Sequence, residues 1–146
     1  MTMAFSKIDV CLICEGIRQE VGNKSVLLGF YGIAPYTQVH IQSFQAPVTL
    51  CFVFSGGKGS AGRYHVSLRL TDPAGVVVSN PQSSPDITGP LGDRVSTNIF
   101  MQFFGRVTMP GTYRVALIVD AIEVFSTTIA ILQAPQQTTG PAPFLN

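Results

Sequence analysis

Residues 111–132, GTYRVALIVDAIEVFSTTIAIL, decide the fold class of this chain. Apolar and polar side chains alternate on both sides of a short break near Asp120, and this pattern is typical of two half-buried strands. The more apolar row of the first strand is Tyr113, Val115, Leu117 and Val119, and that of the second is Phe125, Thr127, Ile129 and Ile131. The stretch therefore predicts a β-hairpin that buries one face.

The register of this hairpin follows from burial. A two-residue loop at Asp120–Ala121 would pair Tyr113 with Thr128, whereas a three-residue loop over 120–122 pairs Tyr113 with Ile129 and Leu117 with Phe125. A slip of one residue exchanges the two faces of a strand, so the register that pairs apolar with apolar side chains is favoured. We therefore predict the three-residue loop.

The rest of the chain has the same character. About eight short apolar runs are separated by turns rich in Gly, Pro, Asn and Asp, and no stretch has a sustained helical period. This pattern predicts one antiparallel β-sandwich domain over residues 1–133, followed by a loosely ordered Pro/Gln/Thr-rich tail over 134–146. Tyr113, at the start of a late strand, suggests an immunoglobulin-like corner. A small β-barrel is the alternative.

Charge is scarce in this sequence. Only 12% of the 146 residues are charged, against about 25% in an average soluble domain. Either much of the surface is therefore polar and uncharged, or part of it is covered by another chain. The net charge of +1 comes with no basic cluster, which argues against a nucleic-acid partner. Neither a membrane-spanning run nor a secretory signal is evident, and the three cysteines fit reduced thiols in the cytoplasm.

No motif in the sequence indicates catalysis, a metal or a cofactor. Cys11 and Cys14 have C-x-x-C spacing, but on a strand they point to opposite faces. The glycine-rich segment 55–62 lacks the spacing of a phosphate-binding loop. His40 and His65 are predicted to be solvent-exposed on separate strands, so we expect no enzyme and no bound cofactor.

Two further blocks carry a resemblance. Residues 14–20 (CEGIRQE) with 23–32 (NKSVLLGFYG) resemble the opening signature of a family of small uncharacterised bacterial proteins, and the similarity continues through 70–75 and 111–115. The resemblance implies an all-β fold and a bacterial cytoplasmic origin. It implies no activity, so no functional residue is carried over.

Three strands are apolar on both faces, and this feature predicts association. A sandwich strand needs only one apolar face, yet residues 26–31, 50–54 and 99–104 each have two. We therefore expect a binding or assembly module that forms a homo-oligomer, most simply a dimer. The alternative to association is that loops such as 80–94 cover the apolar patch within one chain. The candidate interface residues are Leu27, Tyr31, Cys51, Val53, Phe100 and Phe104. The alternative function is an enzyme, which a deep pocket joining His40 or His65 to a carboxylate and a hydroxyl or thiol would favour.

Overall fold

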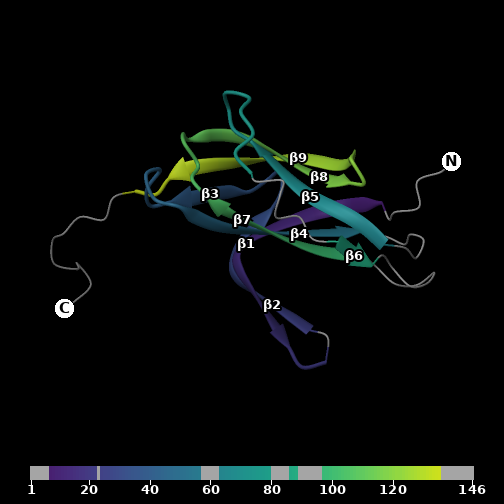
Figure 1. The fold of residues 1–146 in the computed structure, drawn as a ribbon. Coiled ribbons are helices and arrows are strands. Elements are labelled where there is room, and N and C mark those ends of the chain that lie inside the picture. Colours follow the sequence, from purple (N-terminus) through teal and green to yellow (C-terminus); the bar gives the residue numbers. More distant parts are fainter. Residues whose placement is uncertain (1–6, 23, 57–62, 80–85, 89–96, 136–146) are drawn as a thin grey trace, which may run out of the picture.

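Nine β-strands in two sheets make up the described fold (Figure 1). The computed structural model describes residues 7–22, 24–56, 63–79, 86–88 and 97–135. These residues contain no helix, and hence none that could span a membrane. The strands are β1 (Ile8–Glu20), β2 (Lys24–Ile33), β3 (Gln38–Ile41), β4 (Val48–Gly56), β5 (Arg63–Thr71), β6 (Asp86–Thr88), β7 (Thr97–Gly105), β8 (Gly111–Val119) and β9 (Ile122–Gln133). The all-β fold predicted from the sequence is confirmed.

The two sheets have the strand orders β2-β1-β4-β7 and β3-β9-β8-β5-β6. The adjacent strands β5, β8 and β9 have the order of strands C, F and G in immunoglobulin-type sandwiches. One pair departs from the antiparallel arrangement that the sequence predicted, because β3 runs parallel to β9. A parallel pair needs a long connection, and here most of the chain lies between the two strands.

The hairpin of β8 and β9 has the predicted pairing but not the predicted loop. Tyr113 pairs with Ile129 and Leu117 with Phe125, as burial required. The turn itself is only Asp120–Ala121, with φ angles of 49° and 67°, and Val119 pairs with Ile122. A β-bulge after Leu117 then shifts the register by one residue. The bulge restores the apolar pairing that a two-residue turn alone would lose.

The core lies between the two sheets and is built from alternating inward side chains. β8 contributes Tyr113, Val115, Leu117 and Val119, β5 contributes Tyr64, Val66, Leu68 and Leu70, and β4 contributes Leu50, Phe52 and Phe54. In the smaller sheet, the edge strand β7 also contributes Ile99, Met101 and Phe103 to this cluster. Each large side chain buried here contributes on the order of 2 kcal/mol by leaving water.

The sequence predicted a loop over residues 80–94 and a loosely ordered tail over 134–146, and the described structure bears on each of them differently. The predicted loop over 80–94 contains the short strand β6, which pairs with the start of β5, so that part of the prediction is wrong. The sequence there gave only proline and glycine signals, and a three-residue strand leaves no periodicity to read. Residues 136–146 of the predicted tail lie outside the described residues, while the N–H of Ala134 still donates to the carbonyl of Ile41 at 2.7 Å.

Tyr113 ties the start of β8 to the preceding turn. Its ring is fully buried, and its hydroxyl donates to the backbone carbonyl of Met109 at 2.6 Å. Burial raises the pKa of this hydroxyl, so it stays a donor at neutral pH. Immunoglobulin-type domains fix the same corner with a tyrosine near the start of strand F. The corner predicted from the sequence is confirmed.

We expect Tyr113→Phe to destabilise the protein by about 1–2 kcal/mol, because the carbonyl of Met109 loses the donor of a part-buried hydrogen bond while the packing of the ring is kept. Thermal unfolding followed by circular dichroism measures the effect. Tyr36→Phe removes a hydroxyl from a side chain that is almost fully exposed and is the matched control. Equal melting temperatures for the two variants would contradict the role of the corner.

Candidate interface on the four-stranded sheet

The outer faces of the two sheets differ in chemistry. The face of the five-stranded sheet is polar, and it includes Arg69 and Arg114, which both form ion pairs with Glu123. The hydrogen bond from Arg114 holds the pKa of that carboxyl below its usual range. The face of the four-stranded sheet carries apolar side chains instead. This asymmetry singles out the four-stranded sheet as the candidate site.

The strand register assigns side chains to this face, because residues directly opposite one another point to the same side of a sheet. One row across β2, β1, β4 and β7 consists of Phe30, Cys14, Cys51 and Gln102, and the next of Ile33, Leu12, Val53 and Phe100. The central members Cys14, Cys51 and Val53 are buried, whereas the large apolar side chains at both ends are exposed. Apolar side chains therefore extend across most of this face, with the polar Gln102 at the β7 end of the first row.

The candidate residues predicted from the sequence divide between two faces. Cys51, Val53, Phe100 and Phe104 share the outer face by register. Leu27 pairs with Ile17, beyond the last residue of β1 that pairs with β4, and Tyr31 packs against the core cluster. Phe30, which the sequence did not single out, pairs with Cys14 and occupies the outer face in place of Tyr31.

Beyond residue 14, β1 and β2 leave the sheet as a protruding hairpin, visible in Figure 1. Pairing between β1 and β4 ends at Cys14–Cys51, while pairing between β1 and β2 continues to Glu20–Lys24. We call residues 15–29 the arm. A two-stranded ribbon is marginally stable on its own in water, and the arm exposes Val21 and Leu28.

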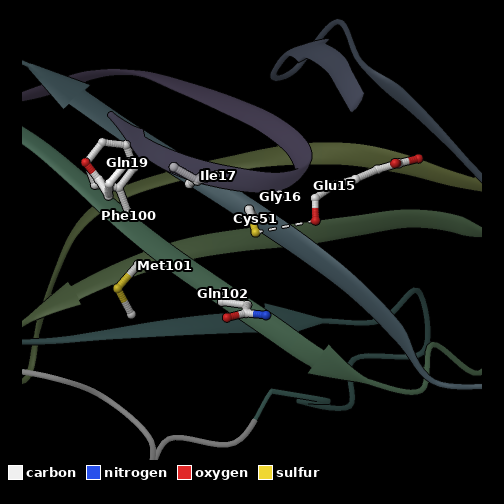
Figure 2. A pocket seen from close by; sticks show the side chains of 8 residues that line it. All are labelled: Glu15, Gly16, Ile17, Gln19, Cys51, Phe100, Met101 and Gln102. Atoms are coloured by element: carbon white, nitrogen blue, oxygen red, sulfur yellow. Dashed lines mark hydrogen bonds between the residues drawn. The ribbon is translucent and has the colours of Figure 1, made fainter. Parts of the chain in front are cut away.

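A cavity of about 350 Å³ lies between the base of the arm and the face (Figure 2). It is lined by Glu15, Gly16, Ile17, Gln19, Cys51, Phe100, Met101 and Gln102. The thiol of Cys51 donates to the backbone carbonyl of Glu15 at 3.6 Å, which ties the base of the arm to β4. Figure 2 shows the carboxylate of Glu15 extending away from the other lining side chains. The cavity has room for an apolar side chain of a partner.

A second cavity, of about 420 Å³, lies on the other side of the arm base. Its lining includes Glu15, Tyr31, His40 and Ser43. The hydroxyl of Tyr31 donates to Oε1 of Glu15 at 3.2 Å, and burial, with the nearby carboxylate of Glu15, raises the pKa of Tyr31 to about 12. This cavity brings His40 together with a carboxylate and hydroxyls, but it is open to solvent and is not the deep pocket that would favour an enzyme. His65 does not line it.

The three thiols are free and buried. Cys11 faces the core opposite Phe54, and Cys14 faces outward beside Cys51, so the C-x-x-C pair does lie on opposite faces. Burial raises the pKa of Cys11 to about 12, and it also raises the pKa of Cys14 and of Cys51. No group of three potential metal ligands occurs in the described part of the chain.

The thiols should therefore react slowly in the folded protein. We expect iodoacetamide at neutral pH to leave Cys11, Cys14 and Cys51 unmodified, because little thiolate is present and access is blocked. Intact-mass spectrometry should show three adducts only after unfolding in denaturant. Rapid labelling of the native protein, a Cys14–Cys51 disulfide or stoichiometric zinc would each contradict this expectation.

Comparisons with known proteins add little about the function of this face. Searches of protein-family models and of curated proteins find no match. Among solved structures, the chain is similar to Pseudomonas fluorescens alkylpurine DNA glycosylase AlkC bound to DNA containing an abasic site analog, with a TM-score of 0.39 and 13% identity. The match covers 68% of this chain and 28% of that one, so this chain spans about a quarter of the enzyme. A similarity this weak supports no functional argument.

Proposed function

We propose that this protein is a non-enzymatic binding or assembly module that associates through the outer face of its four-stranded sheet, most simply as a two-fold homodimer. The observation that supports the proposal is the exposure of large apolar side chains on that face. Phe104 is 70% exposed, Phe30 54% and Phe100 39%. Monomeric proteins rarely expose a contiguous apolar patch of more than a few hundred Å².

Energetics favour covering such a face. Burying about 600 Å² on each partner, at about 25 cal/mol per Å², contributes on the order of 30 kcal/mol before the cost of association. That cost is about 4–15 kcal/mol for lost translation and rotation, with further losses from ordered side chains. The free energy gained by burial therefore exceeds the cost of association only if the two faces pack well. The cavity beside Phe100 can hold a side chain of the partner.

The first test is the mass of the protein in solution. We expect light scattering at micromolar concentration to give about twice the chain mass of 15.7 kDa. Phe104→Lys should raise the dimer dissociation constant at least about tenfold, because a charged group would have to be buried in the contact. Ile122→Lys, at an exposed apolar site of the other sheet, should leave the mass unchanged. A measured mass near 15.7 kDa for the wild-type protein, which is that of the monomer, would contradict the proposal.

An enzyme acting at the cavity of Glu15, Tyr31 and His40 is the second candidate. Its support is the presence of an imidazole, a carboxylate and a phenol around one space. With a pKa raised to about 12, Tyr31 keeps its proton at neutral pH and is a poor base or nucleophile. The described residues include no hydrogen bond from His40 to Glu15 or Tyr31. These features favour the binding module.

The binding module and the enzyme predict different effects of the variant His40→Ala. For a binding module we expect the variant to keep the melting temperature and the solution mass of the wild type, because His40 is exposed and lies off the outer face. An enzyme predicts instead that any turnover detected with hydrolase substrate panels is lost in this variant. Turnover by the wild-type protein that disappears in His40→Ala would favour the enzyme.

A further inference from the structure

The sheets of this protein are protected unequally at their edges. Among the described strands, β2 and β7 form the edges of one sheet, and β3 and β6 form those of the other. Proteins blunt such edges with short strands, bulges, charges or proline, because unpaired backbone groups invite another strand. β3 has only four residues and β6 only three. In β2, a register shift and two glycines with positive φ, Gly29 and Gly32, break the edge.

β7 has none of these devices. All nine of its residues, from Thr97 to Gly105, pair with β4 in one uninterrupted register. The strand contains no charged residue and no proline. No described strand pairs with its other side. β7 therefore presents a long, regular and uncharged edge whose backbone donors and acceptors can accept another strand.

We propose that β7 pairs antiparallel with β7 of a second copy across a two-fold axis at Gln102, joining two four-stranded sheets into one. The proposal rests on the two-fold dimer proposed above but places the contact at the β7 edge of the four-stranded sheet, where Phe100 and Phe104 would contact their counterparts, and not over the whole outer face. In this register Phe100 lies opposite Phe104 of the second copy, and Phe104 opposite its Phe100. Gln102 lies opposite Gln102, where two amides can bond to each other.

The chemistry of the strand identifies the second copy as the partner. Pairing β7 with itself meets no like-charge repulsion, since the strand has no charges. Aromatic side chains directly opposite each other stabilise an antiparallel pair, and the two outward phenylalanines of each strand meet in just this way. On the core side, Met101 lies opposite Phe103.

A single cysteine at the axis tests this geometry. We expect Gln102→Cys to form a disulfide-linked dimer under mild oxidation, seen by non-reducing electrophoresis, because residue 102 lies opposite itself with Cβ atoms about 4.5–5.5 Å apart. The experiment uses a Cys51→Ala background, because Cys51 is the β4 neighbour of residue 102 and could trap the new thiol. Circular dichroism confirms that the variants are folded.

Asn98→Cys in the same background is the matched control. It lies on the same strand and face, but in this register residue 98 of the two copies is separated by eight residue steps, or about 27 Å. We expect no linked dimer from it. Gln102→Lys, which places two ammonium groups at the axis, should raise the dissociation constant at least about tenfold, whereas Gln102→Ala should not.

The outcomes separate this proposal from the function on which it rests. A wild-type dimer that Phe104→Lys weakens, together with no Gln102→Cys linkage, would overturn the β7 pairing and leave the interface proposal standing. A wild-type monomer would overturn both. Equal linkage by Asn98→Cys and Gln102→Cys would also overturn the proposed register.

Discussion

The structure depends on β4 being buried on both of its faces. Leu50, Phe52 and Phe54 fill the space between the sheets, while Cys51 and Val53, on the other side, are also buried. A strand of this kind cannot lie at the edge of a half-solvated sheet, so β4 takes a central place between β1 and β7. Its flanking strands must then carry apolar side chains on the outer face as well.

The arm follows from the same arrangement. β1 pairs with β4 only up to Cys14, yet it continues with β2 for six more residues to Glu20. The ribbon so formed has no second sheet behind it, and one side of its base borders the cavity beside Phe100, while the other borders the cavity of His40. Both candidate sites therefore exist because β1 extends beyond the last residue that pairs with β4.

Sequence and structure agree where burial alone decides. Four inward residues of β8, from Tyr113 to Val119, were predicted correctly, as was the pairing of Tyr113 with Ile129. The predicted three-residue loop was wrong because two backbone arrangements give the same apolar pairing: a longer loop, or a two-residue turn with a bulge. Their difference lies in backbone angles at Asp120 and Ala121, and side-chain periodicity carries no information about those.

The sequence by itself determined the all-β class, the two-faced apolar strands and the placement of Cys11 and Cys14 on opposite sides, since all three follow from period-two alternation. Alternation divides a strand into two sets of side chains, but it does not say which set faces outward. Only the pairing of β2 with β1 decided that Phe30, rather than Tyr31, shares the face of Cys51. Only the tertiary structure, likewise, brought Glu15, Tyr31 and His40 around one cavity and left β7 at an edge. Both depend on strands distant in sequence, whose order in a sheet is set by the packing of the whole chain.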